Sequence, residues 1–540
     1  MINLFQSQKN QIFIIIALTL LSYSTIFANQ LVIDDFDFIV NWESSHQLNL
    51  INLITGDQPG GHEGVYRPLR SLLYGVYYQI FGTNPLGYHL HSLLVHLIST
   101  ILVYLIIQSL VKTLRLQSLL SHYLPFLTSL LFGLHPIHTE AITYIAASME
   151  MTGVVFFLSS FLMYQRDKKL LSILFALLAF FTYEMTLTLP FVLWAYDFSI
   201  RKLSFQRKFD YLKGKLVYFL GILVFFLLKL SFTHNLNRGE YLADSFYLTA
   251  LVMLKAFVKY LELLSLPINL SLVHILPGGI PTLGGVDIKK QLIDQESLLD
   301  PSVLLGLILA LGLVFLAFKL KEFYPLISFG LFWFLITLIP ASQIIPLQVV
   351  MGEKYLYLPS VGFALVIGYL FVFLSKKVNL KVLTTIYLLV VLGYMALTVT
   401  YNQVWKTPEF IWLNASLKAN QSASAHYNLA AIYQSEGQLI KAKEEYLSAL
   451  EVDSEYHPAL NNLGFVYLNL NDLPRAKATF EKAIFIKDFY PMHYGLALVY
   501  KAQNNLDQAL VEYQKTLILN PNFSQAKQEI ELIQYQKSRN

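Results

Sequence analysis

The chain has 540 residues, of which 55% are hydrophobic and only 14% are charged, and its formal net charge is +4. Soluble domains usually carry about 25% charged residues, so the composition excludes a soluble enzyme of this length and excludes a disordered chain. The absence of cysteine excludes disulfides and thiol catalysis. Charge is also uneven, because 27 charged residues fall in the last 140 positions and 47 in the first 400. We therefore predict a membrane domain over residues 1–400, a linker over 401–422 and a water-soluble tail over 423–540.

Apolar stretches that approach the ~20 residues of a membrane-spanning helix recur up to residue 400. The first stretch ends near Ala28 and has two interpretations, a retained span or a cleaved signal peptide. The membrane domain is expected to be all-α, with about eleven spans and the lipid bilayer as its surroundings. The predicted spans are 11–29, 87–111, 121–134, 141–164, 170–182, 187–199, 214–232, 302–318, 324–340, 356–375 and 380–400.

The basic residues indicate the orientation of these spans, because Lys and Arg concentrate in cytoplasmic loops. Clusters at 112–115, 166–169, 201–215, 319–321 and 376–381 mark cytoplasmic ends. The loops 30–86 and 267–301 and the tail then lie on the non-cytoplasmic side. The same bias explains the positive net charge, so we expect no nucleic-acid partner.

Segment 249–266 is apolar but would break this alternation if it crossed the membrane. Its charged residues Lys255, Lys259 and Glu262 fall on one face of a helix. We therefore predict an amphipathic helix that lies at the outer membrane interface.

The tail repeats with a period of 34 and then 33 residues over positions 423–523. Small residues at fixed offsets let two helices approach closely, and aromatic residues fill the space between them. This pattern is typical of three tetratricopeptide repeats, and a helix at about 524–537 would cap the resulting α-solenoid. Such an array binds a peptide or protein in its concave groove, here an acceptor or a partner protein; the alternative is a spacer. The matching positions are Leu429, Ala430, Tyr433, Ala442, Tyr446 and Ala449, then Leu463, Gly464, Tyr467, Ala476, Phe480 and Ala483, then Leu496, Ala497, Tyr500, Ala509, Tyr513 and Thr516.

Two adjacent carboxylates, Asp34 and Asp35, follow the first predicted span in the segment LVIDDFDFIVNW. Carboxylates at the mouth of a membrane domain are costly unless they are solvated, paired or used. Neighbouring side chains point in different directions, so one aspartate could accept a proton from a hydroxyl while the other orients it. The alternative interpretation is a solvated loop.

A second polar cluster, HPIHTE, lies between two apolar stretches and contains His135, His138 and Glu140. Two histidines near a carboxylate have the composition of a metal site, but no second strong ligand pair is visible. A satisfied polar turn is the alternative.

The remaining polar candidates are Arg67 in VYRPL, Glu184 in FFTYEMT, and Glu353, Lys354 and Tyr355 in GEKYLYLP. Interfacial Lys and Tyr are also ordinary membrane anchors. In the predicted topology, however, the charged candidates lie on the same side of the membrane as the aspartates. That convergence favours one polar site over several unrelated loops.

The order of these motifs resembles that of the transmembrane and tetratricopeptide-repeat O-mannosyltransferases. The segments VIDDFDFIVNW, YRPLRSLLYGVYYQIFGTNPLGYHLHSLLVH, LLFGLHPIHTEAITYIAASMEM, TLTLPFVLWAYDF, KYLELLSLPINLS and EKYLYLPSVGF precede the repeats in this order. The resemblance implies a GT-C glycosyltransferase, which takes a sugar, here mannose, from a polyprenyl-phosphate carrier on the non-cytoplasmic face. It also implies that Asp34 or Asp35 is the catalytic base and that Arg67 and Lys354 bind the donor phosphate.

Two positions depart from the family pattern. Tyr183 precedes Glu184 where family members often have Lys, and Lys354 stands where they have Arg. Because Arg binds phosphate through two parallel hydrogen bonds and Lys does not, the identity of the donor stays open. The array of only three repeats leaves the acceptor open as well.

The expected reaction transfers the sugar to a Ser or Thr hydroxyl of a protein. A carboxylate base accelerates such a step by ~10²–10⁴-fold, cations neutralise the leaving phosphate, and a single displacement inverts the anomeric centre. A divalent metal could bridge the aspartates and the phosphate; no other cofactor is expected. The residues expected to shape the site are His135, His138, Glu140, Glu184, Glu353 and Tyr355.

Three alternatives compete with this interpretation. The enzyme could act on a surface lipid or polysaccharide, the chain could be a non-catalytic membrane scaffold with repeats, or it could be a transporter. The expected location is a prokaryotic inner membrane, crossed several times, with the site loops and the repeat tail on the non-cytoplasmic side.

Overall fold

The computed structural model describes residues 7–56, 58–59, 64–116, 119–201, 208–234, 237–283 and 290–539. The chain forms two compact units. The first contains most of the residues up to Ile411, and the second contains the residues from Trp412 onward together with short segments such as Val273–Ile275. Part of the predicted cytoplasmic cluster, Lys202 and Arg207, lies outside the described residues, as do the first six residues of the chain.

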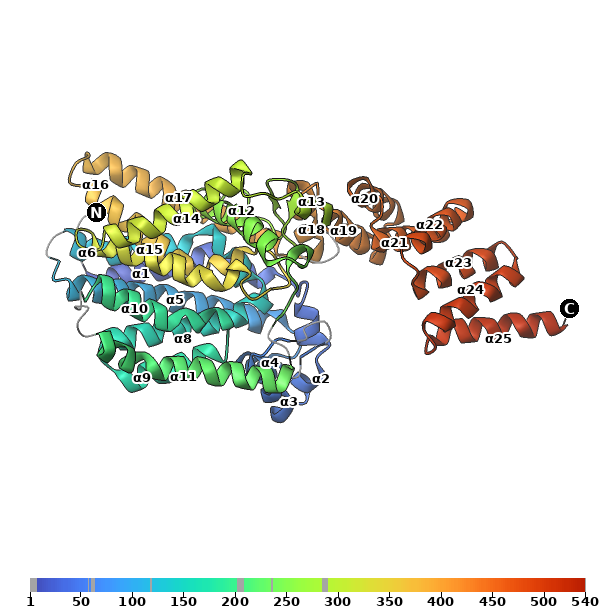
Figure 1. Ribbon diagram of the computed structural model, residues 1–540, viewed down its shortest axis with the longest axis horizontal. Coiled ribbons are helices and arrows are strands. Elements are labelled where there is room, and N and C mark those ends of the chain that lie inside the picture. Colours follow the sequence, from blue (N-terminus) through green and yellow to red (C-terminus); the bar gives the residue numbers. More distant parts are fainter. Residues whose placement is uncertain are drawn as a thin grey trace. The chain divides into compact units, whose positions relative to one another are not determined.

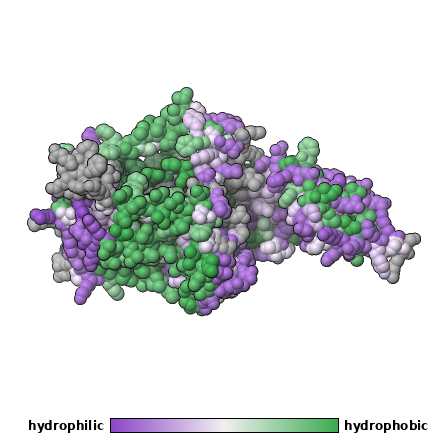
Figure 2. All heavy atoms as spheres, turned by 60° about the horizontal axis from the view of Figure 1, so that its bottom comes forward, coloured by the Kyte–Doolittle hydropathy of each residue, from purple (hydrophilic) through white to green (hydrophobic). Residues whose placement is uncertain are grey.

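The first unit is a bundle of helices, many of which lie side by side (Figure 1). A helix coincides with each predicted span. Seven helical segments of the described residues are long and apolar enough to cross a membrane, and three further apolar helices are shorter. Across this unit, Figure 2 shows a continuous apolar band with hydrophilic residues at both of its edges. The helices are α1 (Gln8–Tyr23), α5 (Pro85–Thr113), α6 (Leu119–Leu134), α8 (Ile145–Gln165), α9 (Lys169–Phe180), α10 (Leu189–Ser199), α11 (Lys208–Thr233), α14 (Pro301–Lys319), α15 (Pro325–Leu338), α16 (Pro359–Leu374) and α17 (Leu380–Val404).

Short elements between the long helices carry most of the polar candidates. After α1 come the 3₁₀ turn η2 (Ser24–Ala28), the π-turn η3 (Phe36–Val40), α2 (Glu43–His46), α3 (Leu50–Thr55) and α4 (Pro68–Phe81). The later ones are η4 (Pro136–His138), α7 (Thr139–Thr143), η5 (Glu184–Thr188), η7 (Leu242–Asp244), α13 (Lys290–Asp294), η8 (Ile339–Ser342) and η9 (Glu353–Leu356). A two-stranded sheet pairs β1 (Ile275–Leu276) with β2 (Ile280–Pro281). The prediction of an all-α fold is confirmed, because this pair is the one sheet of the described residues.

Helix α12 (Phe246–Ser265) covers the segment predicted to lie at the membrane interface, and it is not among the candidate spans of the described residues. Its predicted polar face is nevertheless not open to water. Lys255 is 1% exposed, and its ammonium contacts Glu296 at 2.7 Å and Asp300 at 3.3 Å. A charged residue on the polar face of an interfacial helix is expected to face water. Lys255 is instead buried, because the segment before α14 supplies two carboxylates that pair with it. Lys259 does pair with Glu262 on the helix surface, at 2.8 Å.

Close packing between helices of the first unit relies on glycine. A Cβ atom built on Gly362 of α16 would come within 2.3 Å of the Gly330 carbonyl oxygen of α15. On Gly306 of α14 it would come within 2.3 Å of the Leu254 carbonyl oxygen of α12. Because lipid-embedded helices gain stability from close approach of their backbones, these glycines set the distance between helix pairs.

The second unit contains three helix pairs and a terminal helix. Phe480 packs against Gly464 and Gly495, where an added Cβ atom would come within 2.6 and 2.3 Å of its ring. This is the small-and-aromatic packing that the repeat pattern predicts. The helices of the array are α19 (Ala423–Ser435) with α20 (Leu439–Val452), α21 (His457–Asn469) with α22 (Leu473–Ile486), α23 (Tyr490–Ala502) with α24 (Leu506–Leu519), and α25 (Ser524–Arg539) after them; α18 (Pro408–Lys418) precedes the array.

Candidate active site

The two adjacent aspartates have different surroundings. Asp35 is 1% exposed, and its carboxylate accepts hydrogen bonds from the Val32 amide at 3.0 Å and from the Ala146 amide, at the start of α8, at 2.8 Å. Burial raises its pKa well above the usual value. Asp34 is half-buried, and no backbone amide of the described residues donates to its carboxylate. Asp35 therefore fixes the loop to the start of α8, whereas Asp34 is held by no backbone amide of the described residues.

The backbone before the aspartates is strained. Ile33 has a φ of +48°, a conformation that is rare for a β-branched residue. Such outliers persist where the surrounding structure enforces them, often at functional sites. Here the strain sits directly before Asp34.

Tyr144 and Lys354 lie beside Asp34. The Asp34 amide donates to the Tyr144 hydroxyl at 3.3 Å, and Lys354 Nζ lies 5.7 Å from the centre of the Tyr144 ring. The Tyr144 side chain also hydrogen-bonds to the Asp34 carboxylate. No carboxylate of the described residues lies within 4.0 Å of Lys354 Nζ. Burial lowers the pKa of Lys354, but Glu150 and other acidic groups outweigh burial and raise it. The structure thus brings to the same tyrosine the Asp34 carboxylate, which hydrogen-bonds to its side chain, and an ammonium that has no ion pair among the described residues.

Arg67 is bound by two carboxylates. Its Nε and Nη2 donate to Glu184 at 2.5 and 2.6 Å, and Nη1 donates to Glu150 of α8. The side chain is 3% exposed and lies 5.3 Å from the centre of the Tyr183 ring. Burial opposes the charge of Arg67, but the two carboxylates outweigh it and raise the pKa. The predicted phosphate ligand therefore has its donors engaged within the protein.

Two further arginines extend this arrangement. Arg70 of α4 donates to Glu150 at 3.2 Å, and Arg238, in the loop after α11, donates to Glu184 at 2.7 Å. Burial, together with the neighbouring Arg67, lowers the pKa of Arg70 to about 10. The result is a ladder of alternating charge, which we call the arginine ladder: Arg70, Glu150, Arg67, Glu184 and Arg238.

Glu140 and Glu353 position the segment that carries Lys354. The Lys354 amide donates to Glu140 at 2.9 Å, and burial raises the pKa of Glu140 to about 6. Glu353 is 3% exposed and accepts a hydrogen bond from the Ser271 amide at 2.7 Å. Both predicted carboxylates are therefore occupied by backbone amides and shape the site without lying free in it.

The two predicted histidines are buried in a separate network. His138 contacts the Ser360 hydroxyl at 2.8 Å, and His135 contacts the Leu264 carbonyl at 3.0 Å. Burial lowers the pKa of His135 to about 4, so both rings are neutral at physiological pH. Within the described ranges, no group of three or more His, Asp and Glu side chains is arranged to hold a metal ion.

Sequence reasoning did not assign Tyr144, Glu150, Arg70 or Arg238 to the site. Glu150 gave a signal, since it is a carboxylate inside an apolar stretch, and Arg70 lies one helical turn after Arg67. Arg238 gave none, because it reaches Glu184 only through the packing of the chain.

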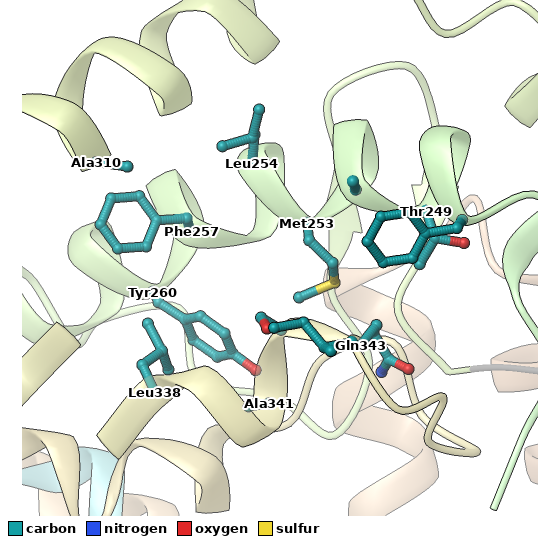
Figure 3. Close-up of a pocket in the computed structure, with 13 residues that line it drawn as sticks. Thr249, Met253, Leu254, Phe257, Tyr260, Ala310, Leu338, Ala341 and Gln343 are labelled. Atoms are coloured by element: carbon teal, nitrogen blue, oxygen red, sulfur yellow. The ribbon is translucent and has the colours of Figure 1, made fainter. Parts of the chain in front are cut away.

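An apolar cavity of about 270 Å³ lies beside the polar cluster, between α12, α14 and the end of α15. Figure 3 shows Met253, Phe257 and Tyr260 of α12 facing Leu338 and Gln343 across it. Tyr260 links the cavity to the polar site, because its hydroxyl accepts a hydrogen bond from Gly352, two residues before Lys354, at 3.3 Å. The cavity exceeds the roughly 150 Å³ that holds a benzene molecule in an apolar core.

The chain is similar in sequence to tetratricopeptide repeats and to proteins named protein O-mannosyl-transferases. The tetratricopeptide repeat family model matches residues 423–456 and 457–487. Protein O-mannosyl-transferase F38B6.6 of Caenorhabditis elegans is 25% identical over 82% of this chain and 63% of its own length. Human protein O-mannosyl-transferase TMTC3 is 24% identical over 85% of this chain and 54% of its own length. The chain thus spans less than two thirds of the length of these two relatives.

A solved structure with similarity to the chain is that of YrrB, described as a tetratricopeptide-repeat protein. It is 27% identical, covers 23% of this chain and 63% of that chain, and has a TM-score of 0.22. The matches to the O-mannosyl-transferases extend over most of the chain and the family model falls on the predicted repeats. The resemblance of the chain to the transmembrane and tetratricopeptide-repeat O-mannosyltransferases is thereby confirmed.

Proposed function

We propose that the chain transfers mannose from a polyprenyl-phosphate carrier to a Ser or Thr hydroxyl of a protein, on the non-cytoplasmic side of a membrane. Relatives named protein O-mannosyl-transferases support the sugar and the protein acceptor. The observation that carries the proposal is the placement of half-buried Asp34 and unpaired Lys354 beside Tyr144. A carboxylate base next to a free cation is what displacement of a phosphate by a hydroxyl requires.

In this proposal Asp34 is the base. It accepts the proton of the acceptor hydroxyl as the hydroxyl oxygen forms a bond to the anomeric carbon. The bond from that carbon to the phosphate oxygen breaks, and its electron pair leaves with the phosphate, next to Lys354. One displacement of this kind inverts the anomeric centre.

The arginine ladder holds together the elements that carry the site. Arg67 holds Glu150 of α8 and Glu184 of η5 together, so we assign it to positioning rather than to direct phosphate binding. The apolar cavity between α12 and α14 is the place that we propose for part of the carrier's hydrocarbon chain, since its wall residue Tyr260 contacts the segment of Lys354.

The proposal is tested by transfer of labelled mannose from polyprenyl-phosphate mannose to membrane proteins, with the Asp34→Asn, Asp35→Asn and Asp37→Asn variants of the full chain. We expect D34N to lower the transfer rate by ~10²-fold or more at unchanged thermal stability. D35N is expected to lower the stability, because its carboxylate accepts two buried amides. D37N is the control for loss of one charge in the same loop.

Two results would contradict the proposal. If D34N transferred mannose at the wild-type rate, Asp34 would not be the catalytic base. Absence of transfer by the wild-type chain from any polyprenyl-phosphate sugar would favour a scaffold, and transfer to lipid or polysaccharide alone would replace the protein acceptor.

A further inference from the structure

Three hydrogen-bond donors in or beside η9 lack an acceptor in the described part of the chain. The Lys354 ammonium has no carboxylate within 4.0 Å and contacts only the rings of Tyr144 and Tyr355, at 5.7 and 5.9 Å. The half-buried Tyr355 hydroxyl makes no hydrogen bond to a described residue. Arg238 uses Nη1 for Glu184, while its buried Nε has no partner. A buried N–H without an acceptor costs stability, so the Arg238 Nε, the one of these three donors that is fully buried, indicates a missing partner.

These donors belong to one neighbourhood. Lys354 and Tyr355 are consecutive residues of η9. Burial raises the pKa of Tyr355, and the charges of Lys354 and Arg238 both act against that rise. The Arg238 backbone is fixed to the segment before η9, since its amide donates to the Pro346 carbonyl at 3.1 Å. A Cβ atom on Gly239 would come within 2.4 Å of the Leu347 carbonyl oxygen, so the two segments are closely packed.

The cations of this neighbourhood differ in how far they are paired. The arginine ladder contains three arginines and two glutamates, and the nitrogens of Arg67 are all engaged by Glu150 and Glu184. Arg70 and Arg238, at the two ends of the ladder, each have a buried Nε without a partner among the described residues. Lys354 has no ion pair to a described residue, although the Glu140 and Asp34 carboxylates act on its charge. The Arg238 end is the one whose charge, like that of Lys354, acts on Tyr355.

We propose that Arg238 and the Tyr355 hydroxyl join Lys354 in a binding site for a phosphate monoester, the group that the carrier becomes when the sugar leaves. This inference rests on the proposed function for the identity of its ligand. A sugar linked through a phosphodiester carries one negative charge, and cleavage of the sugar–oxygen bond leaves the carrier phosphate with a second. Lys354 and Arg238 would supply two cations to that product, and the charges of both act on the Tyr355 hydroxyl beside them.

The site predicts which ligand binds more tightly. A phosphate monoester should bind better than a neutral alcohol with the same hydrocarbon chain. Because a charge-assisted hydrogen bond contributes about 1.5–3 kcal/mol, loss of one such donor corresponds to roughly a 10- to 100-fold weaker affinity.

The experiment measures binding of farnesyl phosphate and of farnesol to the purified full chain in detergent by calorimetry. We expect R238Q and K354Q to weaken farnesyl phosphate binding roughly 10- to 100-fold, Y355F to weaken it less, and all three to leave farnesol binding unchanged. Arg475→Gln is the matched control, because Arg475 is an exposed arginine that pairs with Asp472 at 3.1 Å, far along the chain in the repeats.

A structural role of Arg238 would be to neutralise Glu184. The double variant R238Q/E184Q separates the two roles. If Arg238 binds the ligand, the double variant stays as weak for farnesyl phosphate as R238Q; if it only neutralises Glu184, the double variant recovers wild-type affinity and the inference fails. If R238Q does not fold, R238K replaces it, because lysine keeps the charge but not the planar donor group. We expect R238K to bind farnesyl phosphate more weakly than the wild type does.

The inference is also overturned if the wild-type chain does not distinguish farnesyl phosphate from farnesol, or if R238Q and Y355F bind the phosphate as the wild type does. These outcomes are independent of transfer. An Arg238-dependent phosphate affinity in a chain that transfers no mannose would contradict the proposed function and leave the anion site standing.

Discussion

At the scale of single residues, the properties of the site depend on which of its buried charged groups have hydrogen-bond partners. Asp34 and Asp35 have the same side chain and adjacent positions, yet one accepts two backbone amides and the other accepts none from the described residues. Arg67 is held by Glu150 and Glu184. A charge can be buried at this depth only with partners that satisfy its donors, so Arg67 links the start of α4 to α8 and η5.

The Arg67→Met variant tests this positioning role. Removal of the guanidinium leaves two carboxylates without their shared partner, and breaking a buried ion pair costs about 3–5 kcal/mol. We expect R67M to lower the free energy of unfolding by about that amount, measured by denaturant titration of the purified chain. R67K keeps the charge but cannot serve both carboxylates through a planar fork, so its loss should be smaller. A stable R67M with a selective loss of phosphate affinity would assign Arg67 to the ligand instead.

At the scale of helices, glycine determines how closely α15 and α16 pack. Gly330 and Gly362 face each other, and an added Cβ atom on either would meet the backbone of the other, at 2.9 and 2.3 Å. Helix α16 follows directly on η9, which carries Lys354. The distance between these helices therefore also fixes the position of the Lys354 segment.

The Gly362→Ala variant tests the role of this close approach. The added methyl group cannot displace a backbone oxygen, and overpacking of this kind costs about 1–3 kcal/mol. We expect a lower thermal unfolding temperature for G362A. Gly312 of α14 is the matched control, because a Cβ atom there meets no atom within 4 Å, and G312A should change the stability by less than about 1 kcal/mol. Equal stability of the two variants would show that α15 and α16 can move apart freely.

At the scale of the whole molecule, the chain joins a bundle of apolar helices to a repeat array. The polar candidates for catalysis all belong to the first unit. The array has its own core, for example around Tyr513 and Ile533, and adjacent repeats contact mainly their neighbours, as expected of a solenoid. The proposed chemistry therefore belongs to the first unit, and recognition of a protein is the role that we propose for the second.

Removal of the array after Ala419 tests that division. If the repeats bind the acceptor protein, the truncated chain should retain farnesyl phosphate affinity and lose most of the transfer to membrane proteins, while transfer to a short Ser/Thr peptide at high concentration persists. If the repeats are a spacer, transfer to proteins should remain close to that of the full chain. Binding of farnesyl phosphate is measured on the same sample, so a misfolded truncation is recognised.

The sequence by itself determined the helical bundle, the repeat array and the set of charged residues that could belong to one site. Hydropathy fixes which segments enter a membrane because burial of the apolar side chains dominates the free energy of each segment. The repeat pattern likewise fixes the array, since small residues and aromatics pack against each other at regular spacings along the chain, as Phe480 does against Gly464 and Gly495. Both are local properties, and both are readable from spacing.

Only the tertiary structure decided which candidates are free to act. Whether Asp34 or Asp35 is available depends on the Ala146 amide, more than a hundred residues away, and the engagement of Arg67 depends on Glu150 and Glu184. The sequence carries no signal for Arg238, because its contact with Glu184 joins two loops through packing alone. Electrostatic interactions depend on distance and burial, and neither follows from the order of residues along the chain.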